Sequence, residues 1–316
     1  MAETAIRSRG VGTRLFLAFF GISAFSALVA GAAIYAFFEV GKSLSLIDRR
    51  IDPILASLEV SRSVERIVTA SSALSAVTTE QDRVRVFASV SDESRKLGRY
   101  LNELRDGGIS WQQLEPIEDN AVQLDANLTA LDADVRLRLQ LIGVIRDLLR
   151  GVFDSNQEIQ RLLAPTLLVY DSQISRLAAQ QAGASGREPG SEWEAARPLI
   201  AGLLAERPVR RVQQQVSDTA DTLAQASVSD QKQRLLVLAF QLRRAMRDIE
   251  NGAENLEPKL RPLFLAELDK LKTLVDGPSS IPQLRIKELD LIADANRLLA
   301  ENTSLSAHLK IGRAHV

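Results

Sequence analysis

The chain has 316 residues, of which 39 are basic and 40 acidic, so its net charge is close to zero. This balance removes the electrostatic argument for a general nucleic-acid binder, and a hydrophobic content of 46% is typical of a folded chain. Cysteine is absent, which excludes disulfides, thiol catalysis and thiolate zinc sites. The two histidines, His308 and His315, leave little for histidine-based acid–base or metal chemistry.

The first informative segment is Leu15–Phe38, a run of 24 residues without a charged side chain. As a helix it would be about 36 Å long, against roughly 30 Å for the hydrocarbon core of a bilayer. Residues 15–38 are therefore predicted to form a transmembrane helix that contacts membrane lipid.

Basic residues predict on which side of the membrane the N-terminus of this span lies. Three arginines precede it in residues 1–14, namely Arg7, Arg9 and Arg14. Such an excess predicts a cytoplasmic N-terminus. A cleaved signal peptide is the alternative, with a small-residue cleavage site at Ala30-Gly31-Ala32. Both interpretations place the residues after position 40 outside the cytoplasm.

Small residues recur every four positions within the span, at Ser23, Ala27 and Gly31. This spacing lets two membrane helices approach closely, so we expect a transmembrane packing face in a homodimer. The alternative is that small residues are simply frequent in this segment.

After residue 38 apolar residues keep a spacing of three or four almost throughout, and no strand-like alternation bounded by turns occurs. The sequence therefore predicts an all-α fold, with long antiparallel helices in one or two bundles. Residues 39–182 form the first part of this region. A Gly-rich loop spans residues 183–192, and residues 193–310 form the second part.

Helix ends and breaks are predicted from turn residues. Gly107-Gly108 ends a helix that starts near Gln81, and Ser110 with Gln113 predicts a capping box for the next helix. Four prolines are expected to kink or interrupt helices, namely Pro53, Pro165, Pro198 and Pro208.

The final helix has a seven-residue period. Leucines recur at the positions of a heptad, and the second core position is filled by residues of mixed character. The leucines are Leu284, Leu291, Leu298 and Leu305; the second set is Glu288, Ala295, Asn302 and Leu309. This pattern suits a signalling helix that packs across a dimer seam. An ordinary bundle helix with a leucine stripe is equally consistent with it.

No residue is predicted to be catalytic, to bind a cofactor or to hold a metal. Carboxylate pairs and arginine clusters are present, but solvated helix faces and interhelical ion pairs explain them better than active or anion-binding sites. The pairs are Asp132 with Asp134 and Glu115 with Glu118; the clusters are Arg207, Arg210, Arg211 and Arg243, Arg244, Arg247. Trp111 and Trp193 follow turns at helix starts, where packing is the expected role.

The last six residues, Ile311–Val316, read IGRAHV. They are the translation of ATCGGAAGAGCACACGTC, which resembles a common sequencing-library adapter. We therefore expect residues 311–316 to be an artefactual tail and the natural protein to continue after Lys310.

Three segments resemble the N-terminal sensor region of bacterial hybrid histidine kinases of the TorS type, which sense trimethylamine N-oxide. They are GVGTRLFLAFFGISAFSALVAGAAIYAFFEVG, IDPILASLEVSRSVERIV and IPQLRIKELDLIADANRLLAENTSLSAHL, and the resemblance extends from Gly10 to Lys310. It implies a helical periplasmic sensor, anchored in the inner membrane, that recognises a periplasmic ligand-binding protein. It also implies a downstream second span, a HAMP linker and a kinase that uses ATP and Mg²⁺; none of these lies within this sequence.

Two other functions fit the same pattern. A chemotaxis receptor ectodomain shares the anchor and the helical bundle, but it continues into a long cytoplasmic coiled coil. A membrane-anchored structural coiled-coil protein would lack a second span.

Overall fold

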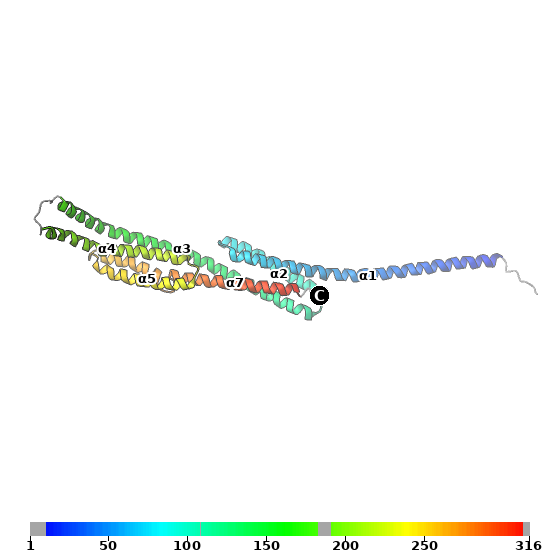
Figure 1. Ribbon diagram of the computed structural model, residues 1–316. Coiled ribbons are helices and arrows are strands. Elements are labelled where there is room, and N and C mark those ends of the chain that lie inside the picture. Colours follow the sequence, from blue (N-terminus) through cyan, green and yellow to red (C-terminus); the bar gives the residue numbers. More distant parts are fainter. Residues whose placement is uncertain (1–10, 108, 183–190, 312–316) are drawn as a thin grey trace, which may run out of the picture. The chain divides into compact units, whose positions relative to one another are not determined.

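The computed structural model describes residues 11–107, 109–182 and 191–311. These residues form seven α-helices and one short 3-10 helix, and no strand occurs among them (Figure 1). The helices are α1 Val11–Ala76, α2 Glu80–Asp106, α3 Trp111–Ala182, α4 Ser191–Val228, α5 Lys232–Gly252, η1 Ala253–Asn255, α6 Arg261–Val275 and α7 Ile281–Ile311. The predicted all-α fold is confirmed.

The chain divides into two compact units. Unit 1 holds the described residues up to Ile67, the segment Ser91–Asp125 and the described residues from Ser304 onward. Unit 2 holds Val68–Val90 and the described part of Ala126–Thr303. Helices α1, α2, α3 and α7 therefore contribute to both units, whereas α4, α5 and α6 belong to unit 2 alone.

Prolines do not interrupt the helices as predicted. Helix α1 continues through Pro53, α3 continues through Pro165, and α4 contains both Pro198 and Pro208. A proline removes one backbone donor and leaves the carbonyl four residues earlier without its helical partner. Pro165 and Pro198 are exposed, so water can satisfy that carbonyl while the flanking turns remain helical.

The predicted helix ends fall near the observed ones. Helix α2 ends at Asp106, one residue before Gly107, and Gly108 lies outside the described residues. At the start of α3, the Ser110 hydroxyl donates to Oε1 of Gln113 at 3.0 Å, and the Gln113 N–H donates to the Ser110 carbonyl. The two residues predicted to form the capping box are therefore in direct contact at this helix start. Of the predicted loop, residues 183–190 lie outside the described part.

Unit 1 has an antiparallel α2–α3 hairpin. The Ser94 hydroxyl donates to Asp125 at 2.6 Å, and Arg105 pairs with Glu118 at 2.5 Å, so residue numbers rise on one helix as they fall on the other. Apolar residues spaced by three or four are buried on each helix of this unit. They include Val60 and Val64 of α1, Leu97, Leu101 and Leu104 of α2, and Leu114 and Leu124 of α3.

Unit 2 has one large core to which α3, α4, α5, α6 and the first turn of α7 all contribute. Phe264 of α6 is fully buried in it. Helices α4 and α5 lie side by side (Figure 1), and the α5 end approaches α4 so closely that a Cβ at Gly252 would lie 2.6 Å from Val212. Only glycine fits this approach without a shift of its neighbour.

The turn between α6 and α7 begins at Gly277, whose φ of 104° lies in the left-handed region that favours glycine. The Ser280 hydroxyl donates to the Gly277 carbonyl at 2.8 Å, which closes the turn just before α7 begins at Ile281. This turn therefore fixes where the last helix starts.

Candidate functional site

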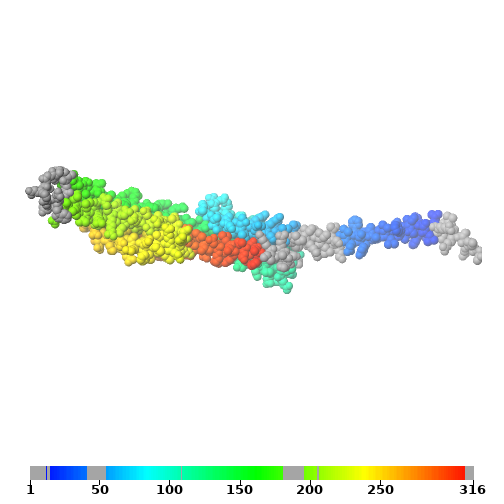
Figure 2. All heavy atoms as spheres, in the orientation of Figure 1, coloured from blue at the N-terminus to red at the C-terminus, as the bar shows by residue number. Residues whose placement is uncertain are grey.

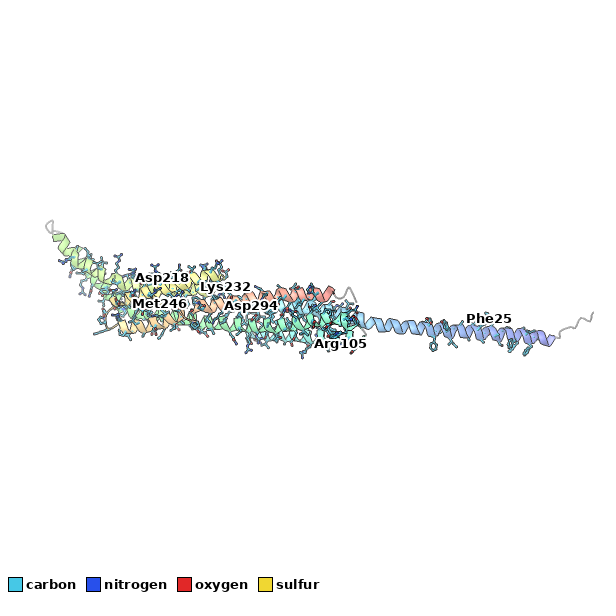
Figure 3. The ribbon with its side chains drawn as sticks, turned by 90° about the horizontal axis from the view of Figure 1, so that it is seen from below. Phe25, Arg105, Asp218, Lys232, Met246 and Asp294 are labelled. Atoms are coloured by element: carbon cyan, nitrogen blue, oxygen red, sulfur yellow. The ribbon has the colours of Figure 1, made fainter. Side chains whose placement is uncertain are left out.

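The first part of α1, Leu15–Val40, has the length and composition of a membrane-crossing helix. It contains 26 residues with a mean hydropathy of 2.1, and none of it is buried (Figure 2). Figure 3 shows Phe25 projecting from the ribbon, and this side chain is 69% exposed. The segment matches the predicted span and extends it by two residues.

Ser23, Ala27 and Gly31 are exposed on this segment. A Cβ at Gly31 would meet nothing within 4 Å, so none of the described residues lies against this position. Their role as a packing face between two membrane helices therefore stays a prediction.

Helix α7 turns both heptad positions toward the interior of the chain. Leu284, Leu298 and Leu305 are buried and Leu291 is half-buried. The second set is buried throughout, at Glu288, Ala295, Asn302 and Leu309. A single chain thus covers most of the predicted seam, and packing of these leucines across a dimer stays a prediction.

In unit 2, α7 packs against the C-terminal end of α1. Leu298 and Ala295 share a core cluster with Leu74 of α1 and with Leu131 and Val135 of α3. The helix that carries the apolar span and the last helix of the chain therefore meet in one cluster. Movement of either helix would disturb the same side chains.

Arg138 of α3 reinforces this junction. Its guanidinium donates to the carbonyl oxygens of Ser75 at 2.8 Å and Val77 at 2.7 Å, at the end of α1. Carbonyls in the last turn of a helix lack intrahelical partners and carry partial negative charge, so a cation is favourable there. Burial lowers the pKa of Arg138, and the negative charge of Glu288 on α7 opposes that shift.

Glu288 is itself a buried carboxylate with a partner on its own helix. It pairs with Arg285 at 2.5 Å, and Arg285 also donates from Nε to the Ser229 carbonyl at 2.9 Å. This arginine therefore ties the start of α7 to the turn after α4. Buried charges need such partners, because an isolated one is costly.

A second arginine, Arg83, ties α2 to α3 in unit 2. It is 8% exposed and pairs with Asp132 across the two helices and with Glu80 on its own helix at 2.8 Å. The hydrogen bond to Glu80, with further contributions from Asp132, raises the pKa of Arg83 against the opposing effect of burial. Asp132 is thus an interhelical ion-pair partner.

The other three acidic residues of the predicted carboxylate pairs lie in different surroundings. Burial raises the pKa of Asp134, with a further contribution from the negative charge of Asp294 on α7. Glu118 pairs with Arg105, whereas Glu115 is exposed.

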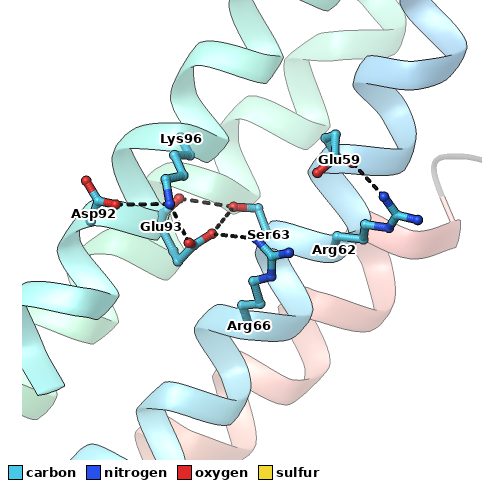
Figure 4. A network of polar contacts seen from close by, with 7 residues as sticks. All are labelled: Glu59, Arg62, Ser63, Arg66, Asp92, Glu93 and Lys96. Carbon is cyan, nitrogen blue, oxygen red and sulfur yellow. Dashed lines mark hydrogen bonds and ion pairs between the residues drawn. The ribbon is translucent and has the colours of Figure 1, made fainter.

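In unit 1, a polar network joins α1 to α2 (Figure 4). The buried hydroxyl of Ser63 donates to the Glu93 carbonyl at 3.1 Å and to its carboxylate at 3.2 Å. Lys96 pairs with Glu93 at 2.7 Å and with Asp92 at 3.0 Å, and Arg66 approaches Glu93 at 3.7 Å. The hydrogen bond from Lys96 lowers the pKa of Glu93 most, and the bond from Ser63 lowers it further.

A groove of about 470 Å³ runs between α2 and α3 in unit 1. Its apolar lining includes Leu97, Leu101 and Val122, and the Ser94–Asp125 and Arg105–Glu118 pairs also line it. Arg105 also lies over the Trp111 ring, 5.7 Å from its centroid. Trp111 therefore has a cation–π partner as well as a half-exposed ring.

The arginine clusters are partly engaged in ion pairs. Arg210 pairs with Glu206 on α4 and with Asp171 on α3 at 2.7 Å, and Arg243 approaches Asp276 at 3.8 Å. The other members of the two clusters are exposed, namely Arg207, Arg211, Arg244 and Arg247. His308 is also exposed, and the side chain of Trp193 lies outside the described part.

The polar contacts found in the described residues are hydrogen bonds and ion pairs within and between helices. Among the described residues, no group of three His, Cys, Asp or Glu side chains could hold a metal ion. Arg83 and Arg138 were not identified from the sequence, because their partners lie on helices distant in the chain. Asn302 could have been identified from the sequence as a buried polar residue, since it is a polar residue at a heptad core position.

No family model matches the sequence, and a search of curated proteins finds no match. Solved structures do match. The TorS sensor domain in complex with TorT in the presence of TMAO superposes with a TM-score of 0.71 at 13% identity. The TorS sensor domain of the V. parahaemolyticus histidine kinase superposes with a TM-score of 0.66, also at 13% identity. Each match covers 83% of this chain and 97% of the other. The chain therefore has the helical fold of the TorS sensor domain.

Proposed function

We propose that this chain is the extracytoplasmic sensor and membrane-anchor portion of a two-component histidine kinase. The observation that carries the proposal is the fold shared with TorS sensor domains over 83% of the chain. The apolar segment Leu15–Val40 supports a membrane anchor, and the arginines before it support a cytoplasmic N-terminus. The helical units would then lie in the periplasm of a bacterial inner membrane.

The proposed signal passes through α7. In unit 2 this helix packs on the end of α1 through Leu298 and Leu74, and Arg138 adds a charged contact to the same end. A ligand shifts such an arrangement only if it binds one packing of the helices better than another. Helix α7 would carry that shift toward a second span and a kinase that uses ATP and Mg²⁺.

The proposed input is a periplasmic ligand-binding protein. Support comes from the structural neighbour, a TorS sensor domain solved in complex with TorT. A homodimer would place two copies of α7 side by side for transmission.

Two measurements test the proposal on the product of the complete gene. Alkaline phosphatase fused after Lys310 should be active, whereas green fluorescent protein fused there should stay dark, because the fusion point lies outside the cytoplasm. The complete protein should incorporate phosphate from labelled ATP, and residues 1–310 alone should not. An inactive phosphatase fusion, or stoichiometric labelling of residues 1–310, would overturn the assignment.

A further inference from the structure

One face of α4 is apolar and exposed, and no other described residue covers it. Ile200, Leu203 and Leu204 are 37%, 47% and 60% exposed. Gly202 lies on the opposite face, where its Cβ position is 3.4 Å from Ile174 of α3. At 100° per residue, Ile200 and Leu204 each lie about 160° from Gly202, so both face away from α3.

Arginines extend the same face at both ends. Arg197 precedes the apolar stripe, and Arg207 and Arg211 follow it at helical spacing; all three are exposed. Arg210 points instead toward α3, where it pairs with Asp171. The six residues of this outer face span about 21 Å of helix, which we call the α4 outer face: Arg197, Ile200, Leu203, Leu204, Arg207 and Arg211.

No acidic side chain balances these arginines between positions 197 and 211 on the outer face. Glu206, the one acidic residue in that interval, is buried and pairs with Arg210. The described residues make no hydrogen bond or ion pair with Arg197, Arg207 or Arg211. An aliphatic stripe with a purely basic rim is unlike an ordinary solvated helix face, and exposed apolar patches of this kind mark interaction sites.

We infer that the α4 outer face docks a folded protein partner with an apolar centre and an acidic rim. A second copy of this chain fits poorly, because a two-fold contact would bring one arginine rim against the other. An anionic membrane, which basic and aliphatic helix faces can also bind, is the alternative that an adduct with lipid would reveal. The inference rests on the proposed function, in which a binding protein delivers the ligand, and it locates that contact.

Photo-crosslinking in the complete protein, in the membrane of its own host, tests the location. A benzoylphenylalanine at Leu203 should form an adduct with a periplasmic protein. The matched control is Leu263 on α6, which is 55% exposed, has no other exposed large apolar residue within four positions, and should form none. The captured protein is then identified, purified and titrated against the complete protein in nanodiscs.

Charge reversal tests the chemistry with that purified partner. Arg207→Glu with Arg211→Glu should weaken binding by about tenfold or more, because each arginine would face an acidic group across the interface. Reversal of an acidic partner residue should restore the affinity. Arg244→Glu with Arg247→Glu on α5 is the control and should change Kd by less than about twofold. Circular dichroism should be unchanged in both variants, because all four arginines are exposed.

The outcomes separate this inference from the proposed function. An adduct at Leu263 but not at Leu203, or loss of binding only in the α5 variant, overturns the docking face and leaves a binding-protein input intact. An adduct with a second copy of the chain, or with lipid, overturns the inference in favour of a dimer or membrane contact. Ligand-dependent phosphorylation of the complete protein without any partner protein overturns both the docking face and the proposed input.

Discussion

Arg138 donates a hydrogen bond of 2.7 Å to the carbonyl of Val77, the residue that follows α1. The two residues are 61 positions apart in the sequence. The bond places a positive charge where the helix that carries the apolar span ends. The negative charge of Glu288 on α7 also acts on this arginine. Helices α1, α3 and α7 of unit 2 are therefore linked electrostatically at this point.

Replacement of Arg138 by alanine should lower the free energy of unfolding by about 1.5–3 kcal/mol, because two carbonyls lose a charged donor. Arg136→Ala is the matched control: this neighbour on α3 is exposed, and its replacement should cost less than about 0.5 kcal/mol. Chemical denaturation of the detergent-solubilised chain, followed by circular dichroism, measures both. Equal effects in the two variants would show that the contact at the end of α1 adds no stability.

The sequence alone predicts the helices well because apolar spacing and glycine turns are local signals. Helix α2 ends beside Gly107 and α7 follows the turn at Gly277, both near the predicted positions. The prolines were misread for a physical reason. Local rules assign a kink or a break to Pro165, whereas α3 continues through it because the flanking turns keep their own hydrogen bonds.

Contacts between helices could not be predicted, because they depend on the register of helices far apart in the chain. Arg83 and Asp132 are 49 positions apart, and nothing in their local sequence identifies either as a partner. The four heptad leucines were visible as a stripe, but the sequence does not tell whether one chain or two covers it. The structure covers Leu298 with Leu74 and Leu131 of the same chain.

The stability of unit 1 should depend on pH through Glu93. Its pKa is lowered in the folded state, so its contribution is fully present above the unfolded pKa and is lost as the pH falls through the folded value. The loss should begin as the pH falls to the ordinary glutamate pKa of about 4.3, because the unfolded chain then binds the proton more readily than the folded one. Glu93→Gln should lose stability at pH 7 and show a flatter acid dependence. Parallel curves for the two proteins would contradict the assigned role of Lys96 and Ser63.

Two leucines on α7 should respond differently to truncation. Leu298 is 6% exposed in a tight cluster, so Leu298→Ala should cost about 2–4 kcal/mol. Leu291 is half-buried, and Leu291→Ala should cost less than about 1.5 kcal/mol. Leu291 is thus the position at which signal transmission can be tested without unfolding. Similar losses of stability at both positions would show that Leu291 is also part of the core.

Asn302 carries the last prediction. Its side chain is fully buried, and among the described residues neither its amide nitrogen nor its oxygen has a hydrogen-bond partner. A buried amide left unpaired costs about 1–3 kcal/mol, so Asn302→Leu, which keeps the branched shape, should raise the free energy of unfolding by a similar amount. Asn302→Asp should lower it, because a buried charge replaces a buried dipole.

A polar residue at a heptad core position also discriminates between alternative registers of packed helices. If Asn302 serves that purpose, Asn302→Leu should hold α7 more firmly while reducing the change in phosphorylation that the ligand produces in the complete protein. Thermal unfolding and ligand-dependent phosphorylation, measured on the same preparation, separate the two effects. A variant that is less stable than the natural protein would mean that the amide finds a partner beyond the single chain, as it would across a dimer seam.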